Sequence, residues 1–195
     1  MSSEKSVWTP ANVVTCVRIA FIPFFMVVAL AAEVSANAPF AVAAFLIYLT
    51  LSLTDKVDGY LARSRNEITD FGKFLDPIAD KLLVFSALLL LLNDGYVTVW
   101  MVFIILVREF LVSALRMVAA SSGEVIAADG LGKAKTVVTM VSLCGYYLSF
   151  ALAAIRFNDG GLIALLSWAL MVAAVVLTVV SGAQYFWNAR HVVFK

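Results

Sequence analysis

Charged side chains are scarce in this sequence: only 14% of its 195 residues are Asp, Glu, Lys or Arg, and 63% are hydrophobic. Soluble domains contain about 25% charged and about 45–50% apolar residues. The scarcity of charge therefore excludes an ordinary soluble domain and predicts an integral membrane protein. The formal net charge of +1 also excludes the strongly basic surface that a nucleic-acid partner would require.

Cysteine and histidine are rarer still, with two residues and one residue respectively. Cys16 and Cys144 lie in apolar segments without a C-x-x-C pattern or a nearby histidine, so we interpret them as buried, unreactive thiols. His191 lies close to the end of the chain and is interpreted as an interfacial residue, not a catalytic one. No cleavable signal sequence is expected, because the first apolar run continues to about Ala32 without a small-residue cleavage site.

Apolar runs separated by short polar segments predict six transmembrane helices in one all-α, membrane-embedded domain that spans residues 1–195. Residues 1–8 are expected to form a flexible N-terminus, and Thr9 and Pro10 are typical of a helix start. The sequence 93–95, Asn-Asp-Gly, predicts a turn. The expected helices cover about residues 10–32, 40–54, 74–92, 97–120, 133–155 and 162–189.

An even number of spans places both termini on the same side of the membrane. Of the 14 Lys and Arg residues, all but Arg156 belong to that side in this topology, which predicts that the side is cytoplasmic. Arg18 interrupts the first apolar run, and two interpretations of it remain open. Either its side chain faces protein or water, or it extends along the helix to the membrane surface.

Four aspartates occur within 26 residues of this otherwise apolar chain. Asp55 and Asp58 are three residues apart, and Asp76 and Asp80 are four apart, so each pair shares one face of a helix. A short polar turn between them predicts two antiparallel helices whose acidic pairs face each other. Carboxylates brought together in this way repel one another unless a cation lies among them, and their oxygens suit Mg²⁺, Mn²⁺ or Ca²⁺. The pattern therefore predicts a two-metal cluster of the kind used in phosphoryl transfer.

The full spacing is Asp-x2-Asp-Gly-x2-Ala-Arg-x8-Gly-x3-Asp-x3-Asp, from Asp55 to Asp80. It resembles the signature of the CDP-alcohol phosphotransferases, and every fixed position is present. The resemblance implies transfer of a phosphoalcohol from a CDP-linked donor to an alcohol acceptor, with release of CMP. It also implies a homodimer in the bacterial cell membrane, with the active site and both termini cytoplasmic.

The resemblance further assigns roles to individual residues. Two Mg²⁺ (or Mn²⁺) ions would be held by four carboxylates, those of Asp55, Asp58, Asp76 and Asp80. Asp80 would also serve as the general base. The CDP-linked donor would be bound by residues in and before the signature, namely Asn12, Thr15, Asp55, Gly59, Ala62, Arg63, Thr69 and Gly72.

Four cations outside the signature suggest an anionic acceptor. Arg108, Arg116, Lys133 and Lys135 all lie near the predicted cytoplasmic ends of two helices, and a phosphomonoester would suit a bidentate arginine with lysines beside it. The alternative is that these side chains only reach for the membrane surface. Segments 10–25, 74–81, 108–116 and 132–136 resemble the bacterial branch of the family that uses CDP-diacylglycerol and sn-glycerol 3-phosphate.

Several other functions stay open at this point. Within the family, the acceptor could instead be that of a phosphatidylinositol-phosphate, phosphatidylserine or cardiolipin synthase. A membrane prenyltransferase also binds Mg²⁺ diphosphate through aspartates, but it would not explain the spacing of Gly59, Arg63 and Gly72. A divalent-cation transporter would place its carboxylates near the middle of the bilayer and continue with polar residues along an exit path.

Overall fold

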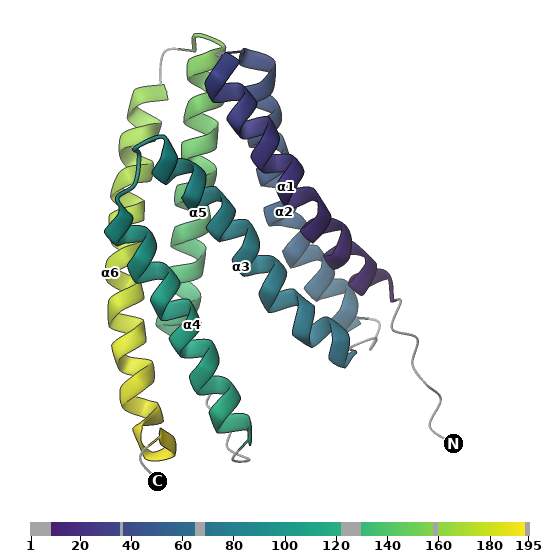
Figure 1. Ribbon diagram of the computed structural model, residues 1–195, viewed down its shortest axis with the longest axis vertical. Helices are drawn as coiled ribbons and strands as arrows, with labels where there is room; N and C mark the ends of the chain where they lie inside the picture. The colour runs from purple at the N-terminus through teal and green to yellow at the C-terminus, as the bar shows by residue number, and fades with distance from the viewer. Residues whose placement is uncertain (1–8, 36, 65–68, 122–129, 158–159, 194–195) are drawn as a thin grey trace. The chain divides into compact units, whose positions relative to one another are not determined.

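The computed structural model describes residues 9–35, 37–64, 69–121, 130–157 and 160–193 (Figure 1). All regular secondary structure within these ranges is helical, which confirms the predicted all-α class. The expected N-terminal segment 1–8 lies outside the described residues, as do residues 65–68 and 122–129. The helices are α1 (Pro10–Ser35), α2 (Ala38–Ser64), α3 (Asp70–Asn93), α4 (Val99–Ser121), α5 (Gly130–Ala154) and α6 (Gly160–Val193).

Capping hydroxyls determine where the first and third helices begin. The Thr9 Oγ1 accepts a hydrogen bond of 3.3 Å from the Asn12 backbone N–H, so α1 starts at Pro10 as predicted. The Thr69 Oγ1 accepts a hydrogen bond of 3.0 Å from the Gly72 backbone N–H. Because of this cap, α3 begins at Asp70, four residues before the predicted start at residue 74.

Most of the other boundaries differ from the prediction because the helices extend beyond their apolar runs. The second helix continues ten residues beyond residue 54 and carries the first acidic pair to Ser64. The predicted 93–95 turn is confirmed: Gly95 has a φ of 76°, and the Tyr96 N–H donates a 2.9 Å hydrogen bond to the carbonyl of Leu91. After this turn, Thr98 caps α4, which starts two residues later than expected.

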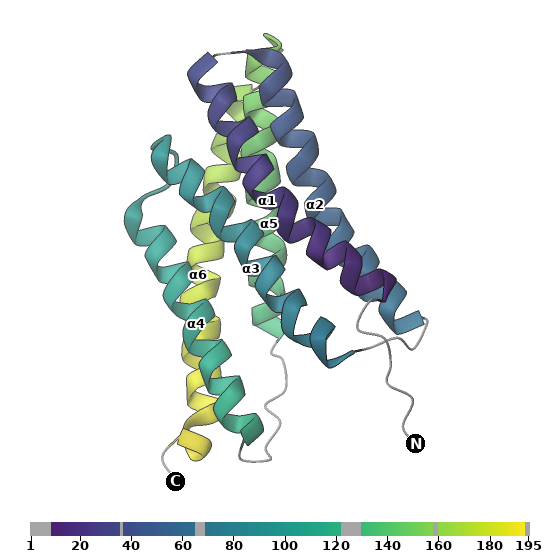
Figure 2. The ribbon, with the colours of Figure 1, turned by 45° about the vertical axis from the view of Figure 1, so that its right-hand side comes forward.

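The chain divides into two compact units, and the first comprises Met1–Leu90 and Tyr147–Gly161. Within it, α1 packs against α2, and α3 runs in the direction opposite to α2 (Figures 1 and 2). Three buried aromatic rings form its centre. The Phe25 ring centroid lies 5.5 Å from that of Tyr48 and 5.2 Å from that of Tyr147. The Tyr147 hydroxyl donates to the Ala87 carbonyl at 3.3 Å and ties α5 to α3.

The second unit comprises Leu91–Tyr146 and Leu162–Lys195, which include α4, most of α5 and α6. Its core contains the fully buried side chains of Ile105, Leu143 and Met171. Small residues let α5 and α6 approach closely. The Ser142 Oγ donates a 2.7 Å hydrogen bond to the Ser167 carbonyl, and the missing side chain of Gly145 leaves room for the Ser167 hydroxyl.

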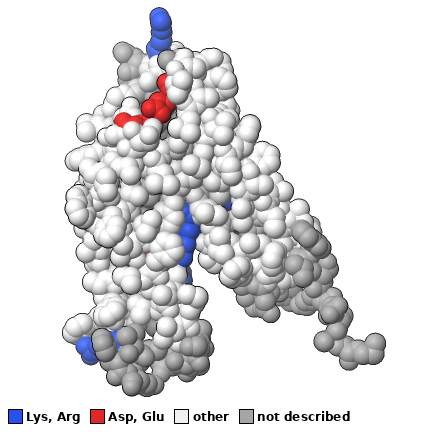
Figure 3. All heavy atoms as spheres, in the orientation of Figure 1, with Lys and Arg blue, Asp and Glu red and all other residues white. Residues whose placement is uncertain are grey.

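Three of the described helices are long and apolar enough to cross a membrane: Asn12–Ser35, Gly130–Ala154 and Gly160–Arg190. Only 22% of the apolar window in α6 is buried inside the protein, so most of its hydrophobic surface faces outward, as a lipid-facing helix requires. Charged atoms are few on the face drawn in Figure 3. These features identify a membrane protein. The full set of six spans stays a prediction, because α4 carries three charged residues and the apolar part of α2 is short.

Candidate active site

Three of the predicted donor-binding residues meet where α1 and α3 begin. The Asn12 Nδ2 donates a hydrogen bond of 2.8 Å to the Thr69 Oγ1, which also caps α3. Gly72 lies directly beside them: a Cβ built on it would stand 2.5 Å from the Asn12 Oδ1 and 3.3 Å from the Thr69 Oγ1. Asn12 is only 3% exposed, so its amide has little freedom to move away. The glycine is therefore required by space, since any side chain would displace the asparagine.

The next turn of α1 reaches the second acidic pair. The Thr15 Oγ1 donates a hydrogen bond of 2.9 Å to the Asp76 Oδ1, and Thr15 itself is 1% exposed. Asp76 is exposed, and Asp80 is half-buried one turn further along α3. The helical backbone of α3 through both residues places them on one face, as the spacing predicts. Thr15 thus holds one oxygen of Asp76 and fixes the direction of that carboxylate.

Arg18 follows on the same stripe of α1, three residues after Thr15. It is 2% exposed and is the largest fully buried side chain among the described residues. A guanidinium that reached for the membrane surface would remain accessible, so the structure favours the interpretation in which Arg18 faces the protein interior.

The first acidic pair lies in the last three turns of α2, with its predicted donor-binding neighbours. The side chains of this segment, including Asp55, Asp58, Gly59, Ala62 and Arg63, lie outside the described residues. Among the residues whose side chains are described, no group of three or more His, Cys, Asp or Glu could hold a metal. That the two acidic pairs face each other therefore stays a prediction.

The possible metal ligands at this end of the first unit nevertheless fit a hard divalent cation. Asp76 and Asp80 contribute carboxylate oxygens, and the hydrogen bonds described nearby involve the hydroxyl groups of Thr15 and Thr69 and the amide group of Asn12. Oxygen ligands of this kind suit Mg²⁺ or Mn²⁺, whereas structural zinc sites are built mainly from cysteine and histidine. A metal ion at this end of the unit would be held by Asp76 and Asp80 together with the acidic pair on α2.

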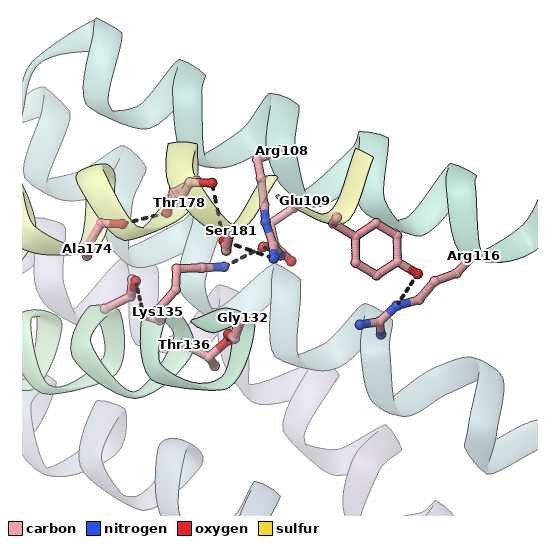
Figure 4. Close-up of polar contacts among 11 residues, drawn as sticks. Arg108, Glu109, Arg116, Gly132, Lys135, Thr136, Ala174, Thr178 and Ser181 are labelled. Atoms are coloured by element: carbon pink, nitrogen blue, oxygen red, sulfur yellow. Dashed lines mark hydrogen bonds and ion pairs between the residues drawn. The ribbon is translucent and has the colours of Figure 1, made fainter. Parts of the chain in front are cut away.

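A second polar cluster occurs in the other unit, where α4, α5 and α6 meet (Figure 4). The Arg108 Nη1 donates to the Glu109 Oε1 at 3.0 Å, and the Lys135 Nζ contacts the same oxygen. The Arg108 Nη2 donates a hydrogen bond of 3.2 Å to the Ser181 Oγ. Two of the four predicted acceptor-binding cations are therefore brought together around one carboxylate.

The remaining two cations lie close by in sequence but make different contacts. The Arg116 Nε donates a hydrogen bond of 3.3 Å to the Tyr185 hydroxyl, and its guanidinium carbon lies 5.5 Å from the centre of that ring. Lys133 is exposed. Arg108 and Arg116 both contact α6, at residues four apart, so they lie on the side of α4 that faces α6.

Sequence reasoning missed the residues that organise this cluster. Glu109 could have been found, because an acidic residue next to an arginine in an apolar helix suggests a buried ion pair. Ser181, Tyr185 and Gly182 carry no such signal, since they are ordinary residues of a long apolar helix. Only the packing of α6 against α4 reveals them.

Comparison with known proteins identifies the relatives of the chain. The family model for CDP-alcohol phosphatidyltransferase matches residues 8–180. The CDP-diacylglycerol–glycerol-3-phosphate 3-phosphatidyltransferase of Bacillus subtilis (strain 168) is 44% identical over 192 residues, covering 91% of this chain and 95% of the relative. The enzyme of the same name from Haemophilus influenzae is 37% identical over 181 residues, covering 90% of each chain.

A third relative, a probable phosphatidylglycerophosphate synthase of Mycobacterium tuberculosis (strain ATCC 25618 / H37Rv), is 35% identical over 179 residues, covering 92% of this chain and 80% of the relative. The matches extend over α1 to α6 and are not confined to the acidic signature. Together with the aspartate spacing, they settle the membership predicted from the motif: the chain belongs to the CDP-alcohol phosphatidyltransferase family.

Proposed function

We propose that this protein transfers the phosphatidyl group of CDP-diacylglycerol to sn-glycerol 3-phosphate, giving phosphatidylglycerol phosphate and CMP in glycerophospholipid biosynthesis. The observation that carries the proposal is the 44% identity, across nearly all of both chains, to a transferase whose name states this reaction. The buried cation cluster of the second unit supports an acceptor that bears a phosphate.

The donor nucleotide is held in the first unit. Its described part consists of Asn12, Thr15, Thr69 and Gly72, and residues at the end of α2 complete it, namely Asp55, Gly59, Ala62 and Arg63. Asp55, Asp58, Asp76 and Asp80 would hold two Mg²⁺ (or Mn²⁺) ions. When bound, such ions neutralise the donor diphosphate and the departing CMP. Thr15 keeps the Asp76 carboxylate oriented for this role.

Asp80 acts as the general base. Its carboxylate accepts the proton of the acceptor's primary hydroxyl, and the resulting oxygen nucleophile attacks the β-phosphorus of CDP-diacylglycerol. A new bond forms between this oxygen and phosphorus, and the bond from the β-phosphorus to the bridging oxygen breaks, so that CMP departs with the electron pair. The remaining contribution of the protein is to position the two substrates.

The acceptor phosphate is bound by Arg108, Arg116, Lys133 and Lys135. A guanidinium can bind two phosphate oxygens at once, and an ammonium adds a point charge beside it. Lys135 and Arg108 are already ordered by Glu109, whereas Arg116 and Lys133 are exposed and remain accessible to a soluble ligand.

The whole chain forms one membrane-embedded domain with six spans in the bacterial cell membrane, with both termini and the active site cytoplasmic. The distribution of Lys and Arg supports this orientation, since all of them but Arg156 lie on the same side in a six-span topology. Glycerol 3-phosphate is water-soluble and reaches a cytoplasmic site directly, while the acyl chains of the donor stay in the bilayer. We further propose a homodimer.

The test is CMP release by the purified protein in detergent. CDP-diacylglycerol is supplied with glycerol 3-phosphate, inositol phosphate, serine or phosphatidylglycerol as acceptor, each with Mg²⁺ and with a chelator. We expect Mg²⁺-dependent release of CMP with glycerol 3-phosphate and little release with the others. Preference for another acceptor would replace the acceptor assignment but leave the family chemistry intact. Absence of CMP release with every acceptor, together with metal flux in proteoliposomes, would support a cation transporter instead.

A further inference from the structure

Three charged side chains from two helices are buried together in the second unit. The side chains of Arg108, Glu109 and Lys135 are 13%, 18% and 7% exposed respectively. One oxygen of Glu109, Oε1, contacts both Arg108 Nη1 and Lys135 Nζ, so both cations are bonded to the same atom (Figure 4). Without that carboxylate, two largely buried positive charges would face each other and repel.

Two glycines on neighbouring helices also constrain the Arg108 side chain. A Cβ on Gly132 of α5 would lie 3.2 Å from the Arg108 Nη2, and a Cβ on Gly182 of α6 would lie 3.1 Å from the Arg108 Cγ. Both contacts are tighter than ordinary van der Waals separation. The Arg108 side chain therefore passes between two positions without side chains, and Ser181 accepts a hydrogen bond from its end.

These contacts fix the stem, the guanidinium and the counter-charge of Arg108 at once. The cluster of Arg108, Glu109 and Lys135 carries a net charge of +1, because two cations share one carboxylate. A phosphomonoester dianion is the ligand class that such a cluster attracts, since both cations can keep their places and still direct their remaining N–H donors to phosphate oxygens. A neutral or zwitterionic acceptor would gain much less binding free energy from these two cations.

We propose that Glu109 is a positioning residue for the acceptor. It does not touch glycerol 3-phosphate, but it holds Arg108 and Lys135 side by side as a preformed receptor for the acceptor's phosphate, with Gly132 and Gly182 providing the space. This inference rests on the proposed function in its choice of acceptor. The positioning role itself requires only that the acceptor carry a phosphate.

The test compares steady-state kinetics of Glu109→Gln and the unaltered protein in detergent, with each substrate varied in turn. Glutamine keeps the shape and an acceptor oxygen but removes the charge. We expect the KM for glycerol 3-phosphate to rise about tenfold, the lower end of what loss of one charge-assisted hydrogen bond costs. The kcat and the KM for CDP-diacylglycerol should change less than about twofold, because the described contacts of Glu109 are with cations assigned to the acceptor and not with residues assigned to the donor. The conservative Glu109→Asp should recover part of the loss.

Two further variants separate positioning from general destabilisation. Gly182→Ala leaves every charge in place but forces the Arg108 stem to move, so it should raise the same KM selectively. Glu33→Gln makes the same chemical change at an exposed residue of α1 and should alter neither KM. If Glu109→Gln does not yield folded protein, Gly182→Ala decides, and an unchanged KM for glycerol 3-phosphate in that variant overturns the proposal.

The outcomes also distinguish this inference from the proposed function. An equal rise in both KM values, or a loss confined to kcat, would overturn the positioning role while the unaltered protein still uses glycerol 3-phosphate. If the unaltered protein prefers another phosphorylated acceptor, the acceptor assignment fails. A selective rise in the KM for that acceptor in Glu109→Gln would then still support the positioning role.

Discussion

The two units handle charge in opposite ways. At the start of α1 and α3, a neutral hydroxyl contacts an acidic residue: Thr15 donates to Asp76, and the nearby Asn12 and Thr69 bond to each other. The negative charge there is oriented but not neutralised by these contacts. In the second unit, Glu109 is placed between Arg108 and Lys135 and offsets half of their charge. Under the proposed function, the first region would bind cations and the second would bind an anion.

The accessibility of the charges differs as well. Asp76 is exposed, whereas the whole Lys135 residue is only 5% exposed and is buried within the protein. Exposed carboxylates remain available to soluble metal ions, and their mutual repulsion is relieved when the ions bind. Buried cations need a permanent counter-charge, because an unpaired buried charge is strongly destabilising. Under the proposed function, the acidic region would be completed by bound metal ions, whereas the charges of the cationic cluster are already partly balanced by the protein's own Glu109.

The largest effect is expected in the acidic region. Asp80→Asn removes the proposed base and should abolish measurable transfer, because general base catalysis contributes about 100- to 10,000-fold. Binding of CDP-diacylglycerol should change little. CMP release and equilibrium binding of the donor measure the two effects separately. Asp94→Asn, in the turn after α3, is the matched control and should keep full activity. Retained turnover in Asp80→Asn would remove it as the base.

The second largest effect is expected in the cationic region. Lys135→Ala should raise the KM for glycerol 3-phosphate about 10- to 100-fold, which corresponds to a charge-assisted hydrogen bond of about 1.5–3 kcal/mol. Arg116→Ala should act in the same direction but more weakly, because its side chain is exposed. The KM for the lipid donor should move less in both variants. If only the lipid KM changed, the acceptor pocket would have to be placed elsewhere.

A steric change tests the neutral contacts of the donor region. Gly72→Ala places a methyl group 2.5 Å from the Asn12 Oδ1 and should disrupt the Asn12–Thr69 pair. We expect the KM for CDP-diacylglycerol to rise about tenfold, since forced overpacking costs about 1–3 kcal/mol. Gly161→Ala is the control, because nothing lies within 4 Å of the added atom. Unaltered donor kinetics in Gly72→Ala would show that this trio does not hold the nucleotide.

The smallest effect is expected at the edge of the cationic region. Tyr185→Phe removes the hydroxyl that accepts from Arg116 Nε at 3.3 Å but keeps the ring beneath the guanidinium. The KM for glycerol 3-phosphate should rise about two- to fivefold, as expected for a hydrogen bond worth about 0.5–1 kcal/mol. Tyr96→Phe, in the turn before α4, serves as a matched control. A change larger than that of Arg116→Ala would mean that Tyr185 acts independently of the arginine.

Most of the helical framework could be predicted from the sequence. The start of α1 and the turn before α4 depend on residues close in the chain, namely Thr9, Pro10 and Gly95, and both predictions are confirmed. The start of α3 was predicted too late. Apolar periodicity detects the buried part of a helix but not a polar first turn that a threonine cap stabilises.

The sequence by itself determined the family and the chemical type of each region, because fixed spacing along a helix places the aspartates and the cations on particular faces. Only the tertiary structure decided which of those side chains meet. Arg108 and Ser181 are 73 residues apart, and Asn12 and Thr69 are 57 apart. Contacts over such separations depend on how helices pack, and the openings left by Gly72, Gly132 and Gly182 acquire meaning only when another helix fills them.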